Sequence, residues 1–184
     1  MQKIYLIFAT IVSISVLLSC KIDLEKNLRL KEEFFFSTDQ FFSNEADRLS
    51  DHRGVIKYVL FNGEEEVMKL DTLNFDHEFT PFKKSDINKV IWSDQYKCDS
   101  IYAGDKNLSR IKCVALSPKL VTRKLEVGFE NGQVESVDIE CMMQKMLLET
   151  MEYMTYKKDQ FYQIKRVQSL KTGTVDSTLV KVTF

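Results

Sequence analysis

The alternation of apolar and polar residues between Lys89 and Phe184 is the feature that most restricts how this chain can fold. Turn signals interrupt it about every ten to fifteen residues. Such closely spaced strands pair antiparallel with their sequence neighbours, as a meander. We therefore predict seven strands, at residues 90–101, 108–117, 120–129, 133–143, 147–156, 161–169 and 177–184.

Two Asn-Gly pairs, at Asn62 and Asn131, mark hairpin turns, and the first joins predicted strands at 55–61 and 64–70. A one-residue slip exchanges the two faces of a strand. In both hairpins a two-residue loop would set polar side chains against apolar ones, so we predict the three-residue loops 61–63 and 130–132. These loops match Met68 and Leu70 with Ile56, Tyr58 and Leu60, and Val137, Ile139 and Cys141 with Val121, Leu125, Val127 and Phe129.

Two segments before the meander have helical spacing. Residues 34–50 place Phe35, Phe42, Ala46 and Leu49 on one face, with Ser37 or Thr38 as N-cap. Residues 74–84 do the same with three phenylalanines, although Pro81 interrupts the pattern and Thr80-Pro81 would suit the start of a separate short turn.

Together these segments predict an α+β fold: N-terminal helices and a hairpin, then a curved antiparallel β-meander of about seven strands, half-barrel-like. The helices are the expected cover for its apolar face. A concave apolar face is either a core or a ligand cavity, and the sequence leaves both open. Trp92 and Tyr96 share one face and suit either role, with core packing as the default.

The first twenty residues predict export. Residues 4–18 carry no charge after the positive Lys3, and this run is shorter than the roughly 20 residues that span a bilayer. Leu17-Leu18-Ser19-Cys20 resembles the lipobox of bacterial lipoproteins, whose cysteine is acylated, for instance with palmitate, and becomes the N-terminus. We therefore predict a signal peptide at 1–19, a lipid-anchored tether at 20–33 and a single α+β domain at 34–184. The expected location is the cell envelope, at the outer membrane, with the membrane as a partner through the lipid on Cys20.

Export also bears on the remaining cysteines, because disulfides persist in oxidising compartments. Centring a turn near Asp105 and Lys106 places Cys98 opposite Cys113 on neighbouring strands. Directly opposed residues lie about 4.5 or 5.5 Å apart at Cα, within disulfide range. We predict a Cys98–Cys113 disulfide, with two buried thiols as the alternative. Cys141 is the odd cysteine and is expected to be buried on the apolar face.

Several function classes find no support. Of 26 basic residues only Lys3 precedes Cys20, which leaves 25 against 27 acidic ones, and no basic patch suggests nucleic acid as a partner. The sequence has no metal-binding motif, nucleophile elbow or phosphate loop, so no cofactor is expected. His52 and His77 are expected at the surface, and Asp94 and Asp99 would face opposite sides of one strand. We therefore predict that the protein is not an enzyme.

Four segments stand out together: Asn74 to Phe82, Ser85-Asp86-Ile87-Asn88-Lys89 with Trp92-Ser93-Asp94-Gln95-Tyr96, Leu116 to Leu125, and Tyr153 to Ile164. Taken together they resemble a family of small uncharacterised lipoproteins of Bacteroidota. The resemblance implies no activity and no functional residue, and it fails at Cys98, where the family has valine. We expect a non-enzymatic binding or accessory module with an apolar ligand or an envelope protein as partner; the alternative is a structural or protein-partner subunit of an outer-membrane complex.

Overall fold

The computed structural model describes residues 35–104 and 107–184. The predicted signal peptide at 1–19, the tether at 20–33 and the proposed lipidation site Cys20 lie outside the described residues.

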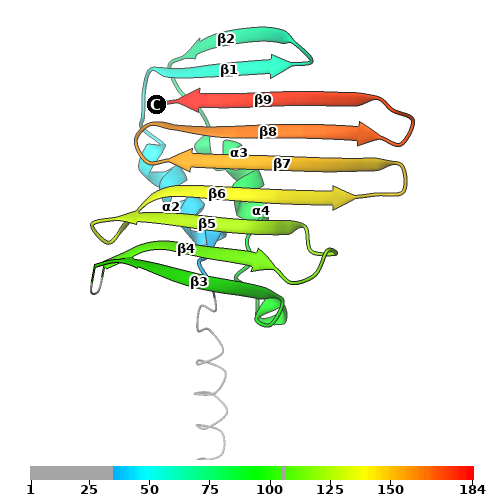
Figure 1. Cartoon of the computed structure of the whole chain (residues 1–184). Coiled ribbons are helices and arrows are strands. Elements are labelled where there is room, and N and C mark those ends of the chain that lie inside the picture. Colours follow the sequence, from blue (N-terminus) through cyan, green and yellow to red (C-terminus); the bar gives the residue numbers. More distant parts are fainter. Residues whose placement is uncertain (1–34, 105–106) are drawn as a thin grey trace, which may run out of the picture. The chain divides into compact units, whose positions relative to one another are not determined.

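Among the described residues, nine strands form one antiparallel sheet in the order β2-β1-β9-β8-β7-β6-β5-β4-β3 (Figure 1). The α+β class and the meander are confirmed, but the sheet has nine strands rather than seven because the hairpin β1–β2 pairs with the last strand, with Val59 opposite Val180. The sheet is open, with β2 and β3 at its edges. The strands are β1 (Val55–Phe61), β2 (Glu64–Leu70), β3 (Tyr96–Ala103), β4 (Asn107–Ala115), β5 (Thr122–Glu130), β6 (Gln133–Gln144), β7 (Leu148–Lys157), β8 (Phe161–Leu170) and β9 (Val175–Thr183).

The start of the third strand was predicted too early. Val90–Trp92 forms the 3-10 helix η1, and β3 begins only at Tyr96. Val90 and Ile91 are both largely exposed, so the apolar residues at the start of the predicted strand are not buried against a sheet.

The predicted three-residue loop of the first hairpin is wrong. Phe61 pairs with Glu64 across a two-residue Asn62-Gly63 turn, in which both residues have positive φ, 48° and 95°. That geometry is the turn that Asn-Gly favours in hairpins. The apolar match did not decide the register because β2 is an edge strand with mostly exposed side chains, so Glu66 stays in water although it lies opposite Val59.

In the second hairpin the predicted three-residue loop is also wrong, but most of the predicted matching of apolar side chains is present. Glu130 pairs with Gln133 across a two-residue turn, and the register then shifts by one residue, so that Val127 faces Val137 and Leu125 faces Ile139. A bulge in the strand, rather than a longer loop, restores the apolar match. A further shift brings Thr122, not the predicted Val121, opposite Cys141.

In the described part of the chain, three α-helices precede the meander: α2 (Thr38–Leu49), α3 (Phe75–Glu78) and α4 (Thr80–Lys84). Ser37 caps α2 by accepting a hydrogen bond from the Gln40 backbone N–H, as predicted. The segment 74–84 is two short helices, because Pro81 in the first turn of α4 starts a new helix, the alternative that the sequence offered.

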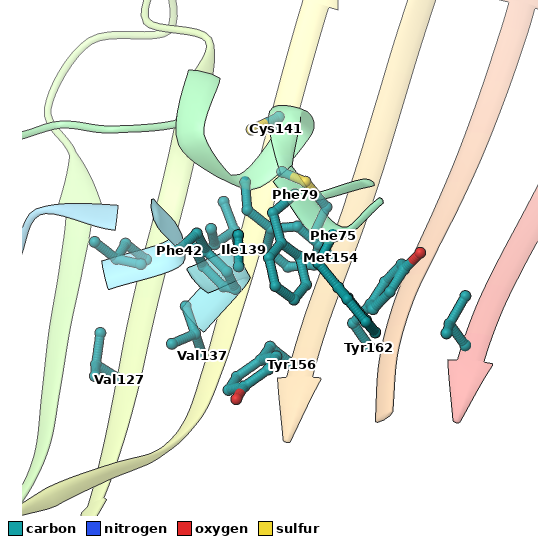
Figure 2. Close-up of a cluster of buried hydrophobic side chains, with 14 of the residues drawn as sticks. Phe42, Phe75, Phe79, Val127, Val137, Ile139, Cys141, Met154, Tyr156 and Tyr162 are labelled. Atoms are coloured by element: carbon teal, nitrogen blue, oxygen red, sulfur yellow. The ribbon is translucent and has the colours of Figure 1, made fainter. Parts of the chain in front are cut away.

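The helices cover one face of the sheet, here called the inner face, through an aromatic core (Figures 1 and 2). Phe42 of α2 packs against Phe82 and Tyr156 at ring-centroid distances of 4.5 and 5.4 Å, and Phe79 packs against Tyr162 at 5.4 Å. Trp92 and Tyr96 belong to the same core, which was their default interpretation. The rings of Phe42, Phe79, Tyr156 and Tyr162, all fully buried, connect the helices to the middle strands β7 and β8.

Side chains on the inner face form rows that run across the strands, and the polarity changes from row to row. The tyrosine row contains Val127, Val137, Tyr156, Tyr162, Val182 and Lys57. The aliphatic row contains Leu125, Ile139, Met154, Ile164, Val180 and Val59. The polar row contains Thr122, Cys141, Glu152, Arg166, Thr178 and Phe61. The core is therefore apolar around the first two rows and gives way to charge in the third.

Phe79→Ala should lower the free energy of unfolding by about 3–5 kcal/mol, because it removes a fully buried ring at the contact between helix and sheet. Phe61→Ala is the matched control: Phe61 is 50% exposed, and its loss should cost about 1 kcal/mol or less. Urea unfolding followed by circular dichroism measures both. Equal effects of the two substitutions would contradict the core described above.

Candidate ligand cavity and disulfide

An open cavity of about 660 Å³ lies where helices α3 and α4 meet the inner face of the sheet. Its helical wall comes from His77, Glu78, Thr80, Pro81, Lys84 and Ser85. Its sheet wall draws on the aliphatic and polar rows, through Ile164, Val180, Cys141, Glu152, Arg166 and Thr178, with Lys57, Val121 and Met143 beside them. A volume of this size is in the range of small-molecule sites.

The two carboxylates of the cavity wall already have partners. Lys57 Nζ lies 2.7 Å from Glu78 Oε1, and the Tyr162 hydroxyl donates to the other oxygen of Glu78. Arg166 Nε donates to Glu152 Oε1 at 2.6 Å, and the Glu152 side chain is only 11% exposed. A buried carboxylate needs such partners because desolvation of a lone charge is costly.

Two cations of the cavity wall, Lys84 and Arg166, have donor groups that no described residue uses. Lys84 is exposed and makes no ion pair with any residue that the structure describes. Within the same part of the chain, the two terminal nitrogens of Arg166 have no hydrogen-bond partner. Apart from His77, the wall contains three cations and two carboxylates, which together sum to one net positive charge.

Tyr156 and Tyr162 repeat one arrangement on neighbouring strands. Each tyrosine hydroxyl donates to a helix glutamate, Glu45 of α2 for Tyr156 and Glu78 of α3 for Tyr162. Burial raises the pKa of both tyrosines well above the usual value, and the adjacent carboxylates raise it further. The hydroxyls therefore stay protonated and remain donors, which ties α2 and α3 to the sheet next to the cavity.

Cys141 is a free cysteine that lines the cavity and is buried on the inner face, as predicted. Burial raises the pKa of its thiol to about 11; the contact with the Thr122 hydroxyl lowers that pKa, and the charge of Glu152 raises it. His77 lines the same cavity, yet no hydrogen bond joins it to Cys141 in the described part of the chain. A thiol that is protonated at neutral pH lacks the activation that nucleophilic cysteines have.

The structure joins Cys98 of β3 to Cys113 of β4 in a disulfide, with the Cα atoms 4.0 Å apart. The strand register is the one predicted: Tyr96 lies opposite Ala115, Cys98 opposite Cys113 and Ser100 opposite Ile111. The bond connects the edge strand β3 to its only neighbour in the described sheet.

The other candidate residues do not come together. His52 follows α2 and packs its ring near Phe184, whereas His77 is exposed on α3. Asp94 precedes β3 and accepts a hydrogen bond from its neighbour Gln95, whereas Asp99 lies within β3, so the prediction that the two face opposite sides of one strand is wrong. Among residues 35–104 and 107–184, no group of three or more His, Cys, Asp or Glu could hold a metal ion.

Sequence reasoning missed the ion pairs Lys57–Glu78 and Glu152–Arg166. A signal was present, because Lys57, Glu152 and Arg166 occupy strand positions that alternate in phase with buried apolar residues. A charge at an inward-facing position indicates a partner or a cavity.

Across the described ranges, no helix has the length and apolar character needed to cross a bilayer.

Comparison with known proteins adds no family: no family model matches the chain, and no curated protein or solved structure matches it either.

We expect one reactive thiol per chain in unfolded, unreduced protein that carries Cys20→Ser and is made in an oxidising compartment. Cys141 supplies that thiol, and reduction should raise the number to three. The same count in a Cys113→Ser variant should give two before reduction, because Cys98 loses its partner. Three thiols before reduction in the parent protein would contradict the disulfide.

Proposed function

We propose that this protein is a non-enzymatic binding module, anchored by lipid in the bacterial cell envelope, which holds a small molecule in the cavity beneath α3 and α4. The observation that carries the proposal is the cavity itself, about 660 Å³, with aliphatic side chains such as Ile164 and Val180 in its wall. The half-barrel curvature expected from the sequence belongs to the proposal, because it would make the inner face concave.

The chemistry of the cavity wall favours binding over catalysis. The Glu78 and Glu152 carboxylates are held in ion pairs, and the raised pKa of the Cys141 thiol keeps it protonated. General acid–base or nucleophilic catalysis needs a group that can exchange a proton near neutral pH or an activated thiolate. Wall residues of this kind serve better to position a ligand.

A cavity-filling substitution tests binding. Purified chain with Cys20→Ser should bind the neutral apolar probe N-phenyl-1-naphthylamine, whose fluorescence rises in an apolar site. Met143→Trp should weaken that binding about tenfold or more, because Met143 lies in the cavity wall and the larger ring occupies its space. About tenfold corresponds to roughly 1.4 kcal/mol.

Met146→Trp is the matched control, because Met146 is 81% exposed in the turn after β6 and is not part of the cavity wall. It should leave the affinity for the probe unchanged. A parent protein that does not bind the probe, or equal losses in the two variants, would argue against a ligand cavity.

The anchor is tested in a bacterial host. Cys20→Ser should abolish incorporation of labelled palmitate and move the protein from the detergent phase to the aqueous phase in a cloud-point partition, since acyl chains on that sulfur are the proposed anchor. Cys141→Ser, which changes a buried cysteine of the folded domain, should retain the label and the partition. Unchanged processing and partition of the Cys20→Ser variant would contradict the proposed lipid anchor and the membrane location that it implies.

A protein-partner subunit is the second candidate. Apolar side chains are exposed where two hairpin turns meet, at Met146 and Leu147 before β7 and at Leu170 at the end of β8. The turns are adjacent because the Lys171 N–H donates to the Leu147 carbonyl at 3.1 Å. The probe experiment separates the candidates, because a cavity that binds nothing would favour the partner role.

A further inference from the structure

We infer that the ligand of the cavity is an anionic amphiphile, a single apolar chain that ends in a carboxylate. The inference rests on the proposed function, because it assumes that the cavity binds a small molecule, and it goes further by assigning the chemistry at each end of that molecule.

The first argument is the change of polarity within the cavity wall. Ile164 and Val180 stand opposite each other on β8 and β9 in the aliphatic row. Two residues further along the same strands, Arg166 and Thr178 stand opposite each other in the polar row. A ligand that contacts both rows needs an apolar part and a polar part in one molecule.

The second argument is the sign of the charge that remains available. Glu152 and Glu78 each accept from a cation of the wall, so binding of a cationic ligand would have to compete with an existing ion pair. Arg166, by contrast, uses Nε for Glu152, and in the described part of the chain its two terminal nitrogens donate to no protein atom. A guanidinium edge of this kind fits the two oxygens of a carboxylate.

The third argument is the position of Lys84. This exposed residue ends α4, lines the cavity and forms no ion pair within the described ranges. Arg166 is also partly open to solvent, with 46% of its side chain exposed. Lys84 and the terminal nitrogens of Arg166, which Glu152 does not use, therefore belong to solvent-exposed side chains of the wall, where a hydrated headgroup can remain. The buried Cys141 and the half-buried Ile164 offer contacts to the chain.

Three ligands of equal chain length test the charge: decanoate, decanol and decyltrimethylammonium, each used below its micelle concentration. The protein is the chain with Cys20→Ser, and the readout is displacement of N-phenyl-1-naphthylamine. We expect decanoate to bind about tenfold or more tightly than decanol, and the cation to bind most weakly. Lengthening the carboxylate from eight to ten carbons should raise its affinity, by up to about fourfold per buried methylene.

A lysine pair on α4 supplies the matched variants. Lys84→Gln should weaken decanoate binding several-fold and Lys84→Glu more strongly, while decanol binding stays unchanged in both. Lys83→Gln should change neither, because Lys83 pairs with Asp76 at 2.6 Å and is not part of the cavity wall. Lys84 is exposed, so its substitution should not disturb folding, which circular dichroism verifies.

Equal affinity for decanoate and decanol, or decanoate binding that is insensitive to Lys84→Glu, would overturn the inference while the cavity remained a binding site. Tighter binding of the cation would overturn it as well. Failure of the probe itself to bind would instead remove the proposed function, so the two failures can be told apart.

Discussion

The contact between the helices and the two tyrosine-bearing strands is the interaction on which the rest of this structure depends. An open antiparallel sheet buries nothing on its own, so its inner face needs a cover. Tyr156 and Tyr162 supply apolar rings to that cover and hydroxyl donors to Glu45 and Glu78 at the same time. Because Tyr162 both packs against Phe79 and hydrogen-bonds to Glu78, the short helix α3 has a fixed position that its four residues could not secure by helix propensity.

The position of α3 in turn determines the cavity. Glu78 ends this helix and places a carboxylate between Lys57 of β1 and Tyr162 of β8. Thr80 and Pro81 follow, begin α4 and form part of the cavity wall. The cavity is thus a consequence of where the aromatic cover ends along the strands, at the step from the aliphatic row to the polar row.

Much of the fold was accessible from local pattern, and the parts that were not have physical reasons. Alternation identified all seven strands of the meander, and parity identified the opposition of Cys98 and Cys113, because both depend only on neighbours in sequence. The predicted loop lengths at Asn62 and Asn131 were wrong for two reasons. In the first hairpin, turn geometry outweighed apolar matching because β2 is an edge strand. In the second hairpin, a bulge within the strand restored the apolar matching without a longer loop. The pairing of β1 with β9 needed long-range information that no local pattern carries.

The two open edges of the sheet differ in a way that bears on self-association. An unpaired edge offers backbone donors and acceptors to any other extended chain. On β2, three consecutive glutamates would repel the same edge of a second molecule. On β3, the register shift between Ile101 and Tyr102 breaks the regular spacing of backbone groups that an added strand would need. Both edges of the sheet therefore discourage the addition of further copies of the chain, so that the sheet does not lengthen into a fibre.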